Sequence, residues 1–77
     1  MNDAKLELYG TDGCHLCEEA AALLQSLSLS ARHIDIAGDD GLVERYGTRI
    51  PVLRRADGAE LGWPFGAEDV MRFTGAN

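Results

Sequence analysis

The sequence has little positive charge. It contains 7 lysines and arginines against 13 aspartates and glutamates, which gives a formal net charge of -6. Proteins that bind nucleic acid neutralise its phosphates with lysine and arginine. The composition therefore argues against DNA or RNA as a partner, while an acidic balance of this size is ordinary for a protein in solution.

Long apolar runs are also missing. No stretch approaches the roughly 20 apolar residues of a membrane-spanning helix, and Met1 to Lys5 lack the basic-then-apolar pattern of a secretory signal peptide. We therefore expect no membrane partner and a cytoplasmic location. A chain of 77 residues suits one small domain, residues 1–77, with a modest core. We expect it to be a monomer.

Cysteine is rare, but the 2 cysteines lie together in the run Cys14-His15-Leu16-Cys17. The run follows an alternating segment and begins an amphipathic one, where a strand gives way to a helix. Free N–H groups and the dipole at a helix start favour a thiolate, so we expect Cys14 to be the nucleophile. Cys17, one turn later, would then be the resolving thiol that cleaves a mixed disulfide with substrate.

Three other interpretations of the cysteines stay open: half of a zinc site, a structural disulfide, and a chance spacing. A closed zinc site needs four ligands, and the other soft candidates are His15, between the cysteines, and His33, far along the chain. We therefore predict no metal. A disulfide across so short a loop removes little entropy from the unfolded chain. Thiol-disulfide exchange is the hypothesis that we favour, because a reducing compartment disfavours permanent disulfides.

The first half of the chain shows a strand, helix, strand pattern. Alternation predicts strands over residues 5–9 and 31–36, and a helical stripe predicts a helix over residues 15–27 between them. This order implies a parallel pair of strands. Cys17 borders the apolar stripe, so we expect it to be protected. The stripe comprises Leu16, Ala20, Leu23, Leu24 and Leu27.

The second half predicts a helix, a hairpin and a final helix. Asp39 or Asp40 would cap a short helix that Gly47 closes. Residues 51–55 and 60–61 flank the turn signal Asp57-Gly58, which is typical of a β-hairpin. Residues 67–74 then predict a short helix that stops at Gly75.

This order, with a CxxC at the first helix start and a proline at the third strand, resembles the glutaredoxin-like proteins of the thioredoxin superfamily. Two motifs carry the resemblance: GCHLCEEA, residues 13–20, and RIPVL, residues 49–53. The resemblance implies one α/β domain with a thioredoxin/glutaredoxin-like fold, β-α-β-α-β-β-α, built on a four-stranded mixed sheet. It also implies a dithiol-disulfide oxidoreductase with Cys14 and Cys17 as catalytic residues.

The resemblance assigns further residues to the site. It implies that Pro51 is cis and lies beside Cys14, with the backbone of Ile50 offered to an extended substrate segment. Arg49 stands where many glutaredoxins have a threonine. Thr11 stands where they have a lysine that meets the glutathione carboxylate.

Charged side chains near the dithiol should influence the stability of the Cys14 thiolate and the binding of charged substrates. Asp12, Glu18 and Glu19 disfavour a thiolate and an anionic thiol substrate, and Arg49 would offset part of this effect. By resemblance to oxidising thioredoxin-fold proteins, protonated His15 would stabilise the thiolate. Its other interpretation is a solvated loop histidine.

Trp63 begins an aromatic run, Trp63-Pro64-Phe65, just before the last helix. One interpretation is packing against the core. The other is an apolar wall of the substrate groove that contacts a partner protein.

Our first hypothesis is therefore an enzyme that reduces or exchanges disulfides in proteins, glutathione mixed disulfides or other low-molecular-weight thiol substrates. It needs no cofactor, and glutathione is one candidate reductant or co-substrate. The alternative is a non-catalytic thioredoxin-fold adaptor or redox sensor that binds a partner protein. A third hypothesis is an iron-sulfur cluster shared by two chains through Cys14 and glutathione. It requires glutathione contacts that this chain lacks, because Thr11 and Arg49 stand in place of the lysine and threonine of many glutaredoxins.

Overall fold

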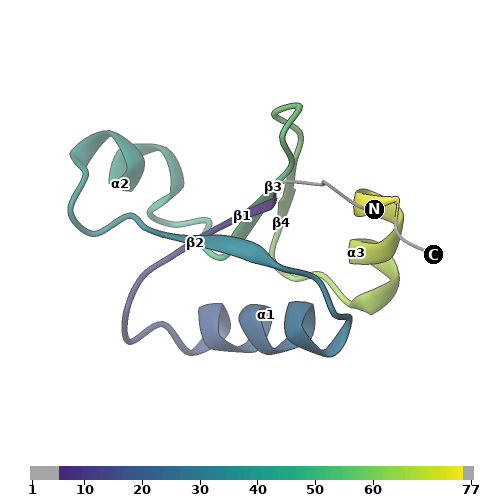
Figure 1. Cartoon of the computed structure of the whole chain (residues 1–77). Helices are drawn as coiled ribbons and strands as arrows, with labels where there is room; N and C mark the ends of the chain where they lie inside the picture. The colour runs from purple at the N-terminus through teal and green to yellow at the C-terminus, as the bar shows by residue number, and fades with distance from the viewer. Residues whose placement is uncertain (1–5, 76–77) are drawn as a thin grey trace.

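The computed structural model describes residues 6–75 and has the predicted element order (Figure 1). The strands are β1 (Leu6–Gly10), β2 (Ala31–Asp35), β3 (Val52–Arg54) and β4 (Glu60–Gly62). The helices are α1 (His15–Ser26), α2 (Asp40–Tyr46) and α3 (Ala67–Thr74). The predicted start of the first strand, Lys5, lies outside the described residues.

The strands form one mixed sheet in the order β2-β1-β3-β4. Strands β1 and β2 are parallel, whereas β3 runs antiparallel to both β1 and β4. The predicted parallel pair and the predicted hairpin are both present. The thioredoxin/glutaredoxin-like fold class is therefore confirmed.

Strand β1 contributes side chains to two separate hydrophobic clusters, because successive side chains of a strand point to opposite faces of the sheet. Leu6 and Leu8 enter a larger apolar cluster, and Tyr9 enters a smaller one. Strand β3 divides in the same way: Leu53 enters the larger cluster and Val52 the smaller. The sheet therefore has a buried cluster on each face.

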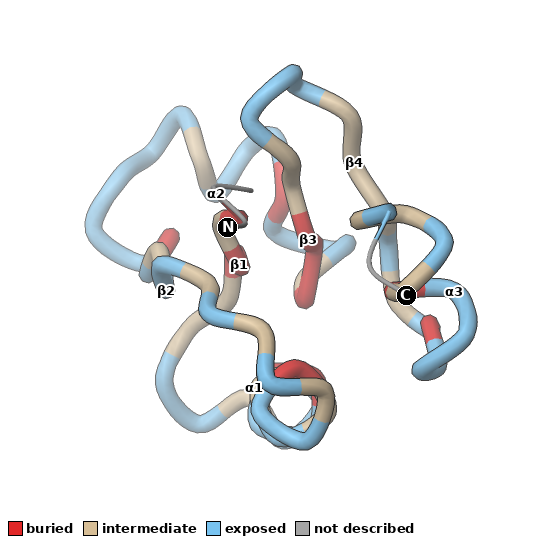
Figure 2. The backbone as a smooth tube through the Cα atoms, turned by 45° about the vertical axis from the view of Figure 1, so that its right-hand side comes forward, coloured by how far each residue is buried: buried red, intermediate tan, exposed pale blue. Residues whose placement is uncertain are grey.

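Helices α1 and α3 complete the larger cluster. Ala20 and Leu24 of α1 and Val70 of α3 are buried in it, and Figure 2 shows the buried part of α1 on its side toward the sheet. One residue of the predicted stripe departs from this pattern. Leu16 is 43% exposed, because the described members of the cluster on α1 begin only at Ala20.

Helix α2 covers the smaller cluster. Its predicted start is confirmed, since the Asp39 carboxylate accepts a hydrogen bond from the Leu42 N–H at 3.1 Å. At its other end the fully buried ring of Tyr46 stacks on Tyr9, with 4.5 Å between ring centroids. The end of α2 is thus fixed against β1.

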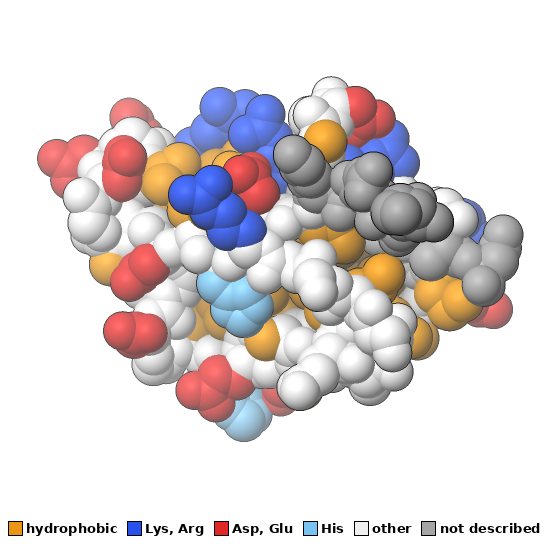
Figure 3. Space-filling model, viewed as in Figure 1, with side chains coloured by type: hydrophobic (Ala, Val, Ile, Leu, Met, Phe, Trp, Pro, Cys, Tyr) orange, Lys and Arg blue, Asp and Glu red, His pale blue; other side chains and the backbone are white. Residues whose placement is uncertain are grey.

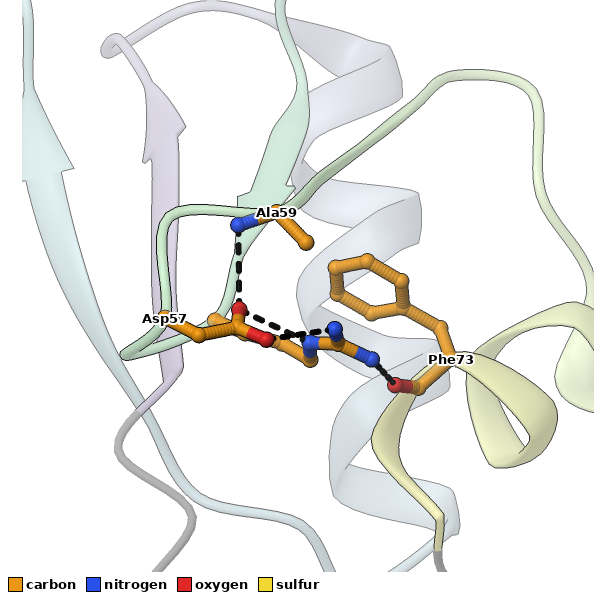
Figure 4. Close-up of polar contacts among 4 residues, drawn as sticks. Asp57, Ala59 and Phe73 are labelled. Carbon is orange, nitrogen blue, oxygen red and sulfur yellow. Dashed lines mark hydrogen bonds and ion pairs between the residues drawn. The ribbon is translucent and has the colours of Figure 1, made fainter.

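Arg55 ties the β3–β4 hairpin to the end of α3. Figure 4 labels three of the residues in this network, Asp57, Ala59 and Phe73. The Arg55 Nε and Nη2 donate to the two carboxylate oxygens of Asp57 at 3.1 and 2.6 Å, and its Nη1 donates to the Phe73 carbonyl at 2.7 Å. Asp57 also accepts from the Ala59 N–H at 3.0 Å. Gly58, with φ of 94°, takes the left-handed conformation that the predicted turn requires.

The acidic balance of the sequence is uneven on the surface. Figure 3 shows aspartate and glutamate side chains along the left and lower parts of the face in view, where α2 and the loop before α1 lie, while arginine side chains gather in the upper part. None of the helices within residues 6–75 is long and apolar enough to cross a membrane.

Candidate functional site

The candidate site lies at one edge of the sheet. Tyr9 of β1 pairs with Val52 of the antiparallel strand β3, so the end of β1 lies beside the start of β3. The loop that leads to Cys14 and the Ile50–Pro51 segment therefore both adjoin this edge. The Ile50–Pro51 peptide bond is cis in the structure, and the Trp63–Pro64 bond, which the sequence analysis did not single out, is cis as well.

Cys14 is the N-cap of α1. Its backbone is extended, with φ of -96° and ψ of 106°, and its carbonyl accepts the first helical hydrogen bond from the Glu18 N–H at 3.1 Å. Its Sγ takes the place of a capping oxygen, because it accepts the Cys17 N–H at 3.1 Å. The sulfur of Cys14 therefore sits against the positive end of the helix dipole.

Cys14 and Cys17 form a disulfide, with 5.2 Å between their Cα atoms. Cys14 is half-buried, whereas Cys17 is only 8% exposed. Cys14 is therefore the more exposed residue of the pair. This difference agrees with the expectation that Cys17 is the protected member of the pair.

A pocket of about 280 Å³ opens beside Cys17. Its lining comes from β1, the loop after β1, α1 and β2, and includes Thr11 and His33. Three carboxylates also line it: those of Asp12, Glu18 and Asp35. The pocket thus lies on the β2 side of β1, whereas Ile50 and Pro51 lie on the β3 side.

The Ile50–Pro51 segment is fixed to the end of α2. The Tyr46 carbonyl accepts the N–H groups of both Arg49 and Ile50, at 2.7 and 3.1 Å. On the other side of Pro51, its carbonyl accepts the Trp63 N–H at 3.2 Å. The position of the segment therefore depends on α2 and on the chain that follows β4.

Side chains strengthen the same anchor. The Tyr46 hydroxyl donates to Glu60 Oε2 at 2.6 Å, and Arg49 Nη2 donates to Glu60 Oε1 at 3.2 Å. The hydrogen bond from Tyr46, with a smaller contribution from Arg49, holds the pKa of Glu60 below its usual value. Burial, together with the bond to Glu60, raises the pKa of Tyr46. Arg49 is thus already paired, although its side chain remains 48% exposed.

The sequence matches the model of a known protein family. Residues 5–73 match the family model described as Glutaredoxin-like domain (DUF836). The chain belongs to this family. As a glutaredoxin-like domain it carries its CxxC pair in the disulfide form.

Solved structures extend the likeness over nearly the whole glutaredoxin-like domain. The X-ray structure of protein XcR50 from X. campestris is 40% identical, with a TM-score of 0.85, and the match covers 94% of this chain and 97% of that one. The solution structure of protein Ne2328 from Nitrosomonas europaea is 32% identical, with a TM-score of 0.79 and coverage of 96% and 99%. No curated protein matches this sequence significantly.

His15 and Trp63 each contact a residue other than the cysteines in the glutaredoxin-like domain. The His15 Nε2 lies 2.9 Å from Glu19 Oε2, one turn further along α1, and the side chain is 81% exposed. Trp63 is half-buried against the larger cluster and packs edge-to-face on Phe65, with 5.1 Å between ring centroids. Packing is the interpretation of Trp63 that these contacts favour.

Two residues near the dithiol have features that the sequence analysis missed. Leu16, between the cysteines, presents an apolar side chain to solvent. Gly10, at the end of β1, lies directly against Cys17. The sequence carries no signal for either feature, because the exposure of Leu16 and the contact of Gly10 with Cys17 both depend on how α1 packs against β1. Within the described residues, no group of three or more histidine, cysteine, aspartate or glutamate side chains is arranged to hold a metal ion.

Proposed function

We propose that this glutaredoxin-like domain is a dithiol-disulfide oxidoreductase. The observation that carries the proposal is the position of Cys14, a half-buried residue whose sulfur accepts an N–H at the start of α1 and is bonded to the buried Cys17. The same N–H and the helix dipole stabilise a thiolate once the disulfide is reduced. The proposed reaction requires no metal or organic cofactor.

The reaction starts from the reduced pair. The Cys14 thiolate attacks one sulfur of a substrate disulfide, forms a mixed disulfide and expels the other substrate sulfur as a thiolate, which takes a proton from water. The Cys17 thiol gives its proton to water and attacks Cys14 Sγ, which expels the second substrate sulfur as a thiolate that takes a proton from water in turn. The substrate gains two electrons and two protons, and the Cys14–Cys17 disulfide remains. A thiol reductant such as glutathione, or a dithiol protein, then returns the pair to its reduced form.

The Ile50–Pro51 segment is the proposed substrate platform. It lies at the same sheet edge as Cys14, and an extended segment could pair with its backbone. Because the Ile50 N–H already donates to Tyr46, the carbonyl of Ile50 is the group that we assign to substrate. Arg49 retains exposed surface beside this segment for an anionic part of the substrate.

Protein disulfides are the substrates that we favour over glutathione mixed disulfides. Thr11 offers no charge for a glutathione carboxylate, and the pocket beside Cys17 carries the carboxylates of Asp12, Glu18 and Asp35. These carboxylates disfavour an anionic ligand there. We further propose that the domain acts as a monomer in the cytoplasm, where reducing conditions allow turnover.

The test is a pair of cysteine variants. In Cys14→Ser, we expect the catalysed reduction of insulin by dithiothreitol to fall to the uncatalysed rate, because the nucleophile is lost. In Cys17→Ser, we expect stable mixed disulfides through Cys14, detectable by mass. Ala22→Ser, on the exposed side of α1, makes a similar polar change on the same helix and should retain activity. Full activity in Cys14→Ser would refute the mechanism.

Exposed Leu16 favours a second candidate function, a non-catalytic adaptor or redox sensor. An apolar side chain between the cysteines suits contact with a partner protein. If this is the function, partner binding should survive the double change Cys14→Ser and Cys17→Ser and should weaken in Leu16→Ser. Loss of all function in the double variant would favour the enzyme.

A further inference from the structure

Gly10 leaves the space that the Cys17 side chain occupies, because glycine has no Cβ atom. A Cβ atom at Gly10 would lie 2.9 Å from Cys17 Sγ and 3.1 Å from Cys17 Cβ. Both distances are well below the roughly 3.5 to 4.0 Å at which non-bonded carbon atoms pack. Any other residue at this position would therefore collide with the Cys17 side chain.

The backbone does not explain this glycine. Gly13, Gly58 and Gly75 have the positive φ that favours glycine, whereas Gly10 lies outside that region, in the regular strand β1. A residue with a side chain could adopt the backbone conformation of Gly10 without strain. The requirement at this position is therefore space beside Cys17.

The space matters most in the disulfide form. The bond to Cys14 holds Cys17 Sγ against Gly10. In the dithiol form that bond is gone, so Cys17 is free to change its side-chain rotamer. The pocket of about 280 Å³ that Cys17 and Gly10 both line gives the freed sulfur room to move. A side chain at residue 10 would therefore destabilise the disulfide more than the dithiol.

We propose that Gly10 is a positioning residue that stabilises the Cys14–Cys17 disulfide relative to the dithiol and so sets the redox equilibrium of the pair. The proposal deepens the proposed function, because it assumes that the pair exchanges with thiols. The reaction is exchange with dithiothreitol. Reduced dithiothreitol gives two electrons and two protons to the disulfide and becomes its own cyclic disulfide.

The experiment compares the wild-type chain with Gly10→Ala in a series of dithiothreitol redox buffers. Thiols are trapped by alkylation, and the fraction reduced is read by mass. We expect the equilibrium constant for reduction to rise roughly five- to tenfold in Gly10→Ala, as for overpacking by one methyl group. A tenfold change corresponds to about 30 mV for this two-electron couple.

Gly62→Ala is the matched control. Gly62 is also the last residue of a strand, and a Cβ there would meet nothing within 4 Å. We expect its equilibrium constant to equal that of the wild-type chain. An unchanged constant in Gly10→Ala, a decrease, or an equal increase in Gly62→Ala would overturn the proposal.

Folding gives a second readout if Gly10→Ala is unstable. Circular dichroism should then show that the variant unfolds when oxidised and folds again when dithiothreitol is added, because reduction lets Cys17 Sγ, which makes the closest contact, rotate away from residue 10. A variant that stays unfolded in both forms would overturn the proposal.

Neither readout uses turnover. A shifted equilibrium in a chain without catalysed disulfide reduction would leave this inference intact and refute the proposed function.

Discussion

The two halves of the candidate site are held by different kinds of interaction. The dithiol helix α1 rests on a cluster of aliphatic and aromatic side chains, with Ala20 and Leu24 buried on its inner side. The Ile50–Pro51 segment instead depends on the end of α2, where the Tyr46 carbonyl and the Tyr46–Glu60–Arg49 hydrogen bonds fix it.

This difference predicts different responses to mutation and to pH. Apolar packing contributes through buried area and filled volume, which do not titrate. The anchor of the Ile50–Pro51 segment contains a carboxylate and a phenol, and both have displaced pKa values. We call α1 with its cysteines the dithiol half and the Ile50–Pro51 segment with its anchor the platform half. The stability of the dithiol half should therefore depend mainly on filled volume, and that of the platform half on single hydrogen bonds.

The largest effect is expected from Leu24→Ala in the dithiol half. The side chain is only 2% exposed, and its loss leaves a cavity between α1 and the sheet, so we expect about 3 kcal/mol less free energy of unfolding. Alanine keeps the helix propensity high, which makes packing the cause. Urea unfolding measures the change. Gln25→Ala, next to it on the exposed side, is the control, and a cost below about 1 kcal/mol in Leu24→Ala would contradict the assignment.

A smaller effect is expected from Tyr46→Phe in the platform half. Phenylalanine keeps the stacking on Tyr9 but removes the hydrogen bond to Glu60, so we expect a loss of about 1.5 to 2 kcal/mol, in the lower part of the range for a hydrogen bond to a charged group. Because Tyr46 anchors the Ile50–Pro51 segment, KM for a protein disulfide should rise more than kcat falls.

Tyr9→Phe is the matched comparison for Tyr46→Phe. Tyr9 belongs to the same cluster, and its hydroxyl donates to Glu7, on the same strand, and accepts from Arg54 Nη1 of β3 at 3.5 Å. We expect its effect on KM to be smaller, since neither bond involves Glu60 or the Ile50–Pro51 segment. Equal KM values in the two variants would refute the special role of the Tyr46 anchor.

Local sequence signals predicted the elements well. The helix stripe placed Ala20 and Leu24 inside, and the Asp39 cap and the Gly75 stop fixed two helix ends. Leu16 fits the same stripe but is exposed, because periodicity identifies a face without showing how far the core extends along it. The fold class followed from these elements together with the resemblance.

The site was predictable only where its residues are close in sequence. The Cys14–Cys17 spacing indicated the dithiol directly. Arg49 was expected to offset acidic side chains near the dithiol, but the hairpin brings Glu60 beside it and pairs the two. The contact between Gly10 and Cys17 also depends on tertiary packing, so the sequence gave no sign of it.

The smallest expected effect is that of pH on the free energy of unfolding. It distinguishes the two halves of the site most clearly, because the platform half contains groups with displaced pKa values. Glu60 has a lowered pKa, so its contribution to stability is complete above its unfolded pKa of about 4.3 and is lost as pH falls through the lower, folded value. Tyr46 has a raised pKa, so its contribution is complete below about 10 and is lost as pH rises through the folded value.

Glu60→Gln should therefore flatten the acid side of the stability profile, measured as free energy of unfolding in urea from neutral to acid pH. Glu44→Gln, at an exposed position on α2, makes the same change and should keep the profile of the wild-type chain. The loss caused by Leu24→Ala should be the same at each pH, because that side chain does not titrate. If Glu60→Gln and Glu44→Gln gave the same profile, the hydrogen bond from Tyr46 would not stabilise the Glu60 carboxylate, and the two halves of the site would not differ in the way described.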